Sequence, residues 1–157
     1  MELLPGYCIR HGSSLDRALL VKFMQLTYQE MFPDQDFSHL AQTVEQYFSS
    51  QTPLWWVEEH GEKITPPPNH PIACLWMGNA IDQVTGDRHA HIFLLYVEPK
   101  HRRRGIATAL MRYAEDWAKN RGDRQMGLQV FQSNQAALNL YSGLGYQTQS
   151  LWLKKLL

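Results

Sequence analysis

The sequence of 157 residues lacks an excess of charge of either sign, because 15 lysines and arginines are balanced by 15 aspartates and glutamates. Proteins that bind nucleic acid or acidic membranes usually carry a broad basic surface. The balanced charge therefore predicts no nucleic-acid partner and no membrane partner.

Long apolar runs are also lacking. No run is longer than that of residues 92–97, which is far too short to span a bilayer. The first ten residues, MELLPGYCIR, do not follow the pattern of a secretory signal peptide. We therefore expect a cytoplasmic protein.

Cysteine is scarce, with Cys8 and Cys74 each inside an apolar stretch. This setting favours two small buried thiols over a disulfide or a nucleophile. Seven histidines are present, but a zinc site needs three or four ligands that converge, and neither cysteine has a second cysteine beside it. The sequence predicts no metal.

The apolar periodicity predicts one domain, residues 1–157, in which helices flank a mixed sheet. The N-terminal third reads as a short strand followed by a helical hairpin, with Ser13 or Ser14 as the first cap. A proline-rich loop at residues 60–71 joins two strands, and we interpret it as a stiff hairpin loop rather than a PxxP ligand. The expected elements in order are a strand at 7–10, helices at 15–26 and 40–48, strands at 54–59, 72–78 and 89–97, a helix at 106–121, a strand at 126–130, a helix at 133–145 and one or two strands in 146–157.

The most unusual stretch is RRRGIATALM, residues 102–111, in which three arginines precede a glycine and the start of a helix. The first turn of a helix presents backbone N–H groups without partners, and its dipole is positive there. Such a turn suits a phosphate or diphosphate. A solvated basic turn that binds nothing is the alternative. The Walker pattern and the GxGxxG pattern are both absent, which argues against nucleotide hydrolysis and hydride transfer.

Residues 91–146 resemble the GCN5-related N-acetyltransferase (GNAT) superfamily. The resemblance lies in two segments, FLLYVEPKHRRRGIATALMRYAEDWAKNRG and LQVFQSNQAALNLYSGLGY. The family turn [QR]xxGx[GA] fits at Arg102, Gly105 and Ala107. Upstream of about residue 77 only the order of elements agrees. The resemblance implies an α+β fold with a mixed, mostly antiparallel sheet, a single N-acetyltransferase domain, and acetyl-CoA as cosubstrate.

The resemblance also implies cofactor-binding residues. Backbone groups at the end of the central strand would bind the pantetheine arm in a wedge between two splayed strands, backbone amides of the arginine turn would hold the pyrophosphate, and an asparagine would contact the arm. Helix capping is an equal alternative for that asparagine. The residues concerned are Leu95, Tyr96 and Val97 for the arm, Arg102, Arg103, Arg104, Gly105, Ile106 and Ala107 for the pyrophosphate, and Asn134.

For catalysis, the resemblance implies that Tyr141 protonates or orients the departing sulfur, with core packing as the alternative. His91 lies where some family members carry a catalytic glutamate, and imidazole titrates in the useful range. His89 is expected on the same face of the strand. Glu58, Glu59 and water relays compete for the role of base. The N–H of Val97 would polarise the thioester carbonyl.

The implied partner is a small-molecule or peptide amine that accepts the acetyl group and enters on the side of the helical hairpin. Asp34 and Asp36 are weak candidates for attracting a cationic amine. A non-catalytic acyl-CoA-binding module is the competing hypothesis. A homodimer is possible if the short C-terminal segment leaves a sheet edge open, although Lys154 and Lys155 would guard that edge. We expect most of the aromatic and methionine residues on the acceptor side to belong to the core; two or three that line a pocket would indicate an apolar or aromatic acceptor. These residues are Tyr28, Met31, Phe32, Trp55, Trp56, Trp76 and Met77.

Overall fold

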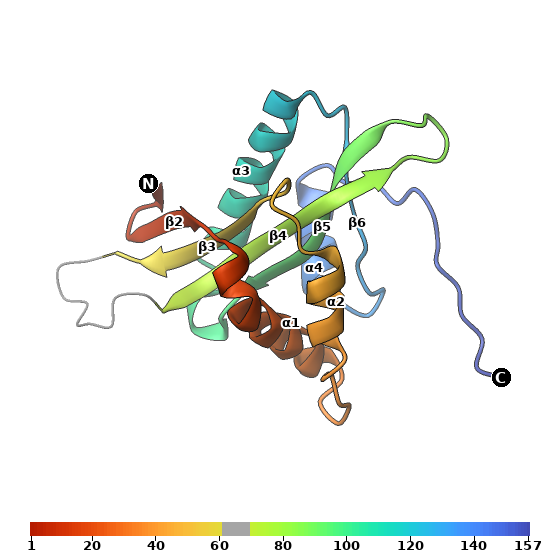
Figure 1. The fold of residues 1–157 in the computed structure, drawn as a ribbon, viewed down its shortest axis with the longest axis horizontal. Helices are drawn as coiled ribbons and strands as arrows, with labels where there is room; N and C mark the ends of the chain where they lie inside the picture. The colour runs from red at the N-terminus through yellow and green to blue at the C-terminus, as the bar shows by residue number, and fades with distance from the viewer. Residues whose placement is uncertain (61–69) are drawn as a thin grey trace.

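The computed structural model describes residues 1–60 and 70–157. Most of the proline-rich loop, including the segment interpreted as a stiff hairpin loop, lies outside the described residues. One sheet of six strands runs through the molecule in the order β1-β2-β3-β4-β5-β6 (Figure 1). Its strands are β1 (Glu2–Leu4), β2 (Tyr7–His11), β3 (Leu54–Glu59), β4 (Pro71–Ile81), β5 (Arg88–Val97) and β6 (Met126–Leu128).

Neighbouring strands are antiparallel except for β5 and β6, which are parallel. The expected mixed, mostly antiparallel sheet is therefore confirmed. The parallel pair requires a crossover, and the long helix between the two strands provides it. Four α-helices and two 3-10 turns complete the described fold: η1 (Ser14–Asp16), α1 (Arg17–Met31), α2 (Leu40–Tyr47), η2 (Pro99–His101), α3 (Ile106–Arg121) and α4 (Gln135–Gly143).

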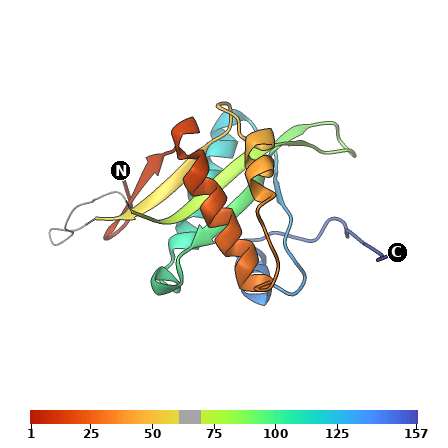
Figure 2. The ribbon, with the colours of Figure 1, turned by 60° about the horizontal axis from the view of Figure 1, so that its bottom comes forward.

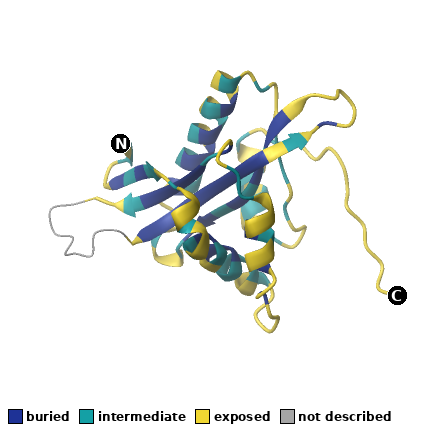
Figure 3. Ribbon diagram, viewed as in Figure 1, coloured by how far each residue is buried: buried dark blue, intermediate teal, exposed yellow. Residues whose placement is uncertain are grey.

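The helices form one layer on each face of the sheet (Figures 1 and 2). Helices α1 and α2 cover one face, where Phe23, Trp56 and Trp76 belong to a common core. Helix α3 covers the other face, where Leu110 packs with Trp55. The middle strands are consequently buried on both sides, as their near-continuous apolar sequences predict (Figure 3).

The first helix differs from the expectation at its start. Ser13 caps the 3-10 turn η1 in a reciprocal box with Asp16, and α1 begins only at Arg17. Leu15, which we expect on the apolar stripe of the helix, therefore lies in the 3-10 turn and is 93% exposed. The different residue period of a 3-10 turn moves it off the stripe.

Strand β5 contains a bulge at Phe93, because Trp76 pairs with Leu94 whereas the next residue, Met77, pairs with Ile92. Phe93 and Leu94 consequently both face the layer of α1 and α2. Ile92 and Leu95 pack instead against the core under α3. The bulge thus reverses the alternation of side chains halfway along the strand.

The prediction of one or two strands within residues 146–157 is wrong. No strand follows α4, and the end of the chain extends away from the sheet with its side chains exposed (Figures 1 and 3). The segment contains apolar residues typical of a strand, but a strand also needs a partner for its backbone. No described strand pairs with it.

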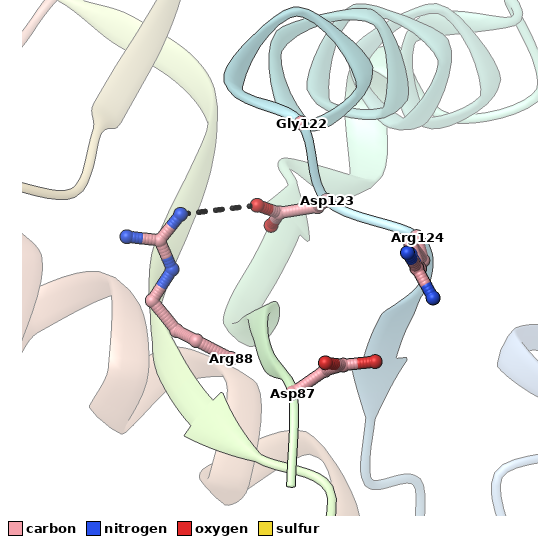
Figure 4. Close-up of a pocket in the computed structure, with 5 residues that line it drawn as sticks. All are labelled: Asp87, Arg88, Gly122, Asp123 and Arg124. Carbon is pink, nitrogen blue, oxygen red and sulfur yellow. Dashed lines mark hydrogen bonds and ion pairs between the residues drawn. The ribbon is translucent and has the colours of Figure 1, made fainter. Parts of the chain in front are cut away.

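The end of α3 is joined to β5 by the buried carboxylate of Asp123 (Figure 4). Gly122 adopts a left-handed conformation that ends the helix and turns the chain toward the sheet. Asp123 then accepts hydrogen bonds from the N–H of Ala90 at 2.8 Å and from Arg121 Nε at 2.9 Å, and it lies 3.5 Å from Arg88. Burial alone would raise the pKa of Asp123, but these donors outweigh it and hold the pKa below its usual value.

We predict that Asp123→Ala lowers the free energy of unfolding by about 3 kcal/mol, because two arginines and a buried N–H lose their acceptor. The control is Asp116→Ala, an exposed aspartate of α3, which should change stability by less than about 0.5 kcal/mol. Since the lowered pKa makes the carboxylate stabilising above pH ~4 and not below its own pKa, the difference should shrink as the pH falls. Urea unfolding at pH 7 and pH 3 measures both effects, and equal losses in the two variants would contradict the role of Asp123.

Candidate functional site

The arginine turn precedes α3 with an unusual backbone. Gly105 is the N-cap residue with φ +83°, and no side chain caps the helix within the described part of the chain. The first bond inside the helix runs from the N–H of Ala109 to the carbonyl of Gly105, so the N–H groups of residues 106–108 precede the helical ladder. Arg103 has φ +63°, a strained conformation for a residue with a side chain. Such a turn next to a helix N-terminus forms a concave set of donors that suits an anion.

Two of the three arginine side chains bind other parts of the protein. Arg102 donates from Nε to the carbonyl of Val97 at 2.8 Å and pairs with Glu30 at the end of α1. Arg104 donates to the hydroxyl of Tyr7 at 2.8 Å. Only Arg103 has no recorded side-chain partner among the described residues. The arginine run therefore anchors the turn as well as supplying positive charge.

Strands β5 and β6 separate after a short contact. They pair only from Ala90 to Ile92 on β5, although β5 continues to Val97. The N–H of Glu98, the residue after β5, donates to the carbonyl of Ile72 on β4. By alternation, the N–H groups of Leu95 and Val97 point to the opposite side, where β6 has diverged. The parting strands leave these donors in line with the arginine turn, in the wedge that the resemblance implies.

Tyr96, the third residue expected to bind the arm, has a different position. Its side chain is buried in the core under α1, with the Arg102 guanidinium 5.7 Å from its ring. Its backbone pairs with Cys74 on β4. The Tyr96 side chain therefore packs behind the wedge, whereas the backbone N–H groups of Leu95 and Val97 point into it.

Asn134 caps α4, as the alternative interpretation predicts. Its Oδ1 accepts from the N–H of Ala137 at 3.2 Å, and its Nδ2 lies 3.9 Å from Met31 Sδ at the end of α1. Nearby, the ring of Phe131 contacts Tyr28 and Phe32 of the same region, with centroids 6.0 and 5.4 Å apart. The end of α1 thus touches the loop between β6 and α4.

His91 lies where β5 and β6 begin to part. Its partner in the register is Gly127 on β6, and a Cβ at Gly127 would lie 3.4 Å from His91 Nδ1 and 2.9 Å from His89 Cε1. The glycine thus makes room for both imidazoles, whose centroids are 6.4 Å apart. Burial, and then the neighbouring His89, lower the pKa of His91. His91 is consequently neutral at pH 7, as a proton acceptor must be.

The competing carboxylates lie elsewhere. Glu58 is paired with Arg10, and Glu59 lies 3.2 Å from His101. Glu58 pairs with Pro71 at one end of β4, whereas His91 pairs with Gly78 seven residues along that strand, about 23 Å away. These glutamates belong to the end of the sheet that carries the arginine turn.

Tyr141 lies on α4 and packs against the core under α3, with its ring 5.9 Å from that of Tyr146. Burial raises the pKa of Tyr141 to about 12, so its hydroxyl stays protonated at neutral pH. The Tyr146 hydroxyl donates to Glu115 at 2.8 Å. Tyr141 is therefore a packing residue whose hydroxyl keeps its proton at neutral pH.

The expected acceptor residues divide into two groups. The three tryptophans are fully buried in the two cores, and Met77 lies under α3. Phe32 is 37% exposed and meets Phe131, which is 44% exposed and was absent from the sequence expectation. No periodic signal identifies Phe131, because it lies in the loop after β6. Asp36 is engaged in a turn with Ser38, which lowers its pKa.

The remaining expectations concern the two cysteines, a metal site and a membrane span. Cys74 is buried, which raises its thiol pKa, whereas Cys8 is only half-buried. No group of three or more His, Cys, Asp or Glu side chains converges within residues 1–60 and 70–157. In the same residues, every helix is too short or too polar to cross a membrane.

Comparisons with known proteins place these features in a family. The model of the acetyltransferase (GNAT) family matches residues 20–146. The uncharacterized N-acetyltransferase MJ1207 of Methanocaldococcus jannaschii is 33% identical over 84 residues, which cover 52% of this chain and 35% of that protein. The chain thus spans about a third of the length of this relative.

Two solved structures share the fold. A predicted acetyltransferase with acetyl-CoA from Clostridium acetobutylicum has a TM-score of 0.75 and 20% identity, over 95% of each chain. The aminoglycoside 6'-N-acetyltransferase AAC(6')-Ih from Acinetobacter baumannii has a TM-score of 0.66 and 22% identity, over 97% of this chain and 99% of the other. At these identities the likeness concerns the fold alone.

Proposed function

We propose that this chain, which belongs to the acetyltransferase (GNAT) family, moves the acetyl group of acetyl-CoA to a primary amine by direct attack in a ternary complex. The observation that carries the proposal is the second half of β5, whose edge toward β6 is unpaired and which leads to the N–H groups at the start of α3. In this proposal residues 1–157 act as one N-acetyltransferase domain without a metal. The proposed location is the cytoplasm, with no nucleic-acid or membrane partner.

The backbone fits the cosubstrate at two places. The N–H groups from Arg103 to Ala107 would bind the pyrophosphate, since the N–H of Arg102 already donates to the carbonyl of Pro99. Arg103 is the side chain placed to add charge. The N–H of Val97, the donor nearer to the arginine turn, would bind an amide of the pantetheine arm, in the manner of an added strand. Asn134 would line the opposite wall through its Nδ2, since its Oδ1 already caps α4.

The proposed chemistry assigns one proton transfer to each side of the wedge. About one lysine-like amine in a thousand is neutral at pH 7, so a base raises the reactive fraction. His91 would take the amine proton, directly or through water, as the nitrogen attacks the thioester carbonyl. Because the thioester is the end of the arm farther from the diphosphate, the N–H of Leu95 rather than that of Val97 would stabilise the oxyanion. Tyr141 would protonate the sulfur as the C–S bond breaks.

Direct attack is favoured over an acyl-enzyme intermediate. Cys74 is buried and its pKa is raised, so it is a poor nucleophile. Cys8 lies on β2, which is separated from β5 by two strands. No other cysteine exists in the sequence.

The acceptor would approach between the end of α1 and the loop that carries Phe131. The partly exposed rings of Phe32 and Phe131 favour an amine with an apolar or aromatic part. Both a small molecule and a peptide satisfy this chemistry. Because one structural neighbour is an aminoglycoside acetyltransferase, an aminoglycoside belongs in the panel of amines to be tested.

We predict that Tyr141→Phe lowers kcat about 100-fold and leaves the KM for acetyl-CoA nearly unchanged, because it removes a proton donor and keeps the ring. Tyr146→Phe is the matched control, since its hydroxyl is bonded to Glu115 instead. Thiol release from acetyl-CoA over an amine panel measures both. If acetyl-CoA binds but no amine raises thiol release above hydrolysis, the chain is an acyl-CoA-binding module and the enzyme proposal fails.

For His91→Gln we predict at least a tenfold loss of kcat/KM together with the loss of the acidic limb of its pH profile. The wild-type activity should fall as the pH drops below ~6.5, because protonation of a base with a lowered pKa removes its function. His11→Gln, an exposed position on β2, should keep the wild-type profile. An unchanged profile in His91→Gln would place the base at another residue or at water.

Two substitutions at Gly105 that differ in charge but hardly in shape test the diphosphate site. Gly105→Asn keeps a residue that tolerates the left-handed conformation, whereas Gly105→Asp adds a carboxylate that competes for the same N–H groups. We predict that Gly105→Asp weakens acetyl-CoA binding at least tenfold more than Gly105→Asn, as measured by calorimetry. Equal affinities in the two variants would contradict an anion site at this turn.

A further inference from the structure

Three ring-bearing side chains, here called the aromatic row, lead from the end of α2 onto β5. The ring centroid of Tyr47 lies 5.5 Å from that of Phe93, and the centroid of Phe93 lies 5.6 Å from that of His91. The row is on the face of the sheet that α1 and α2 cover, because His91 alternates with Ile92, which packs under α3. Tyr47 is 49% exposed, so the row opens to solvent at the end of α2.

Gly78 on β4 and the buried Trp76 fix the central ring of the row. Gly78 pairs with His91, and a Cβ at this position would overlap the ring of Phe93. The glycine therefore makes room for that ring beside the imidazole. Trp76 packs against the same ring with centroids 4.9 Å apart and is 1% exposed. Core packing thus holds Phe93 in place before a ligand binds, which lowers the cost of ordering the site.

Carboxylates are scarce near the aromatic row, and none of its three side chains is acidic. The acidic residues of the end of α1, the following loop and α2 are Glu30, Asp34, Asp36 and Glu45. Glu30 pairs with Arg102, and Asp36 accepts hydrogen bonds within its own turn. Glu45 lines a separate hollow between α1 and α2. Of these four, Asp34 alone remains without a recorded role among the described residues, which suits a single cation but not a polycation.

We propose that the aromatic row determines the acceptor, which is an arylalkylamine: one primary amine joined to one aromatic ring by a short linker. In the proposed acetyl transfer, on which this inference rests, the amine would lie at His91. Its ring would stack with Phe93 and Tyr47, since aromatic pairs are favourable at centroid distances such as these. Once deprotonated for attack, such an amine carries no charge. A polycation would instead keep several charges in a site that offers one carboxylate.

Calorimetry with two matched amines measures this specificity without turnover. 2-Phenylethylamine and 2-cyclohexylethylamine share a carbon skeleton and a charge, but only the first has an aromatic ring. The wild-type protein saturated with coenzyme A should bind 2-phenylethylamine about tenfold more tightly, because it alone forms ring pairs. Tyr47→Leu should reduce this ratio to about threefold or less, since one of the two rings is lost, whereas Tyr47→Phe should keep it.

Gln46→Leu is the matched control, because it makes the same change at the neighbouring exposed position of α2, and it should keep the wild-type ratio. Circular dichroism should be unchanged in all three variants, since both positions are exposed. Equal affinities of the wild type for the two amines would overturn the proposal. A wild-type ratio that survives in Tyr47→Leu would overturn it as well.

Thiol release with the same amines separates this inference from the proposed acetyl transfer. Tighter binding of 2-phenylethylamine without any thiol release would refute acetyl transfer and leave the row as a site for aromatic amines. Equal kcat/KM for the two amines would refute the role of the row and leave acetyl transfer intact. Sisomicin, an aminoglycoside with several amino groups, should react at least tenfold less efficiently than 2-phenylethylamine, and a higher kcat/KM for sisomicin would also overturn the proposal.

Discussion

The early parting of β5 and β6 is the constraint on which the rest of the site depends. A fully paired strand has no backbone donors to offer, whereas β5 loses its parallel partner after Ile92 and keeps five more residues. The N–H groups of Leu95 and Val97 are directed into that opening. The parting also brings His91 to the point of divergence, beside Gly127. The opening thus combines unpaired donors, a neutral imidazole and access from the arginine turn.

Contacts between distant residues keep the two walls of the opening in place. Glu30 near the end of α1 pairs with Arg102, and the next residue, Met31, contacts Asn134 on the other wall. Arg102 also bonds to the carbonyl of Val97. The arginine therefore ties the turn both to the strand before it and to the helix on the far side of the sheet. Its side chain contributes to the geometry of the site, and the backbone of the turn supplies the donors.

The sequence predicted the order of elements from residue 7 to residue 145 and the arginine turn, because these follow from local signals, but it missed β1. The mostly antiparallel sheet followed from the family resemblance. Apolar periodicity and the glycine at the start of α3 are local. The partners of Arg102 and Arg104 could not be predicted, since they lie 72 and 97 residues away. The bulge at Phe93 was equally hidden, because a strand buried on both faces has no alternation to interrupt. The role of Gly127 becomes apparent only when the parallel pairing places it beside His91.

The error at the C-terminus has a different origin. An apolar composition predicts that a segment is buried, but it does not predict which surface buries it. The expectation assumed that Leu151–Leu157 would find a strand in the same chain. In the structure the nearest candidate, β6, is open at its outer edge while the segment points away from it. An exposed apolar segment and an unpaired sheet edge are each unfavourable, and the described part of the chain contains both.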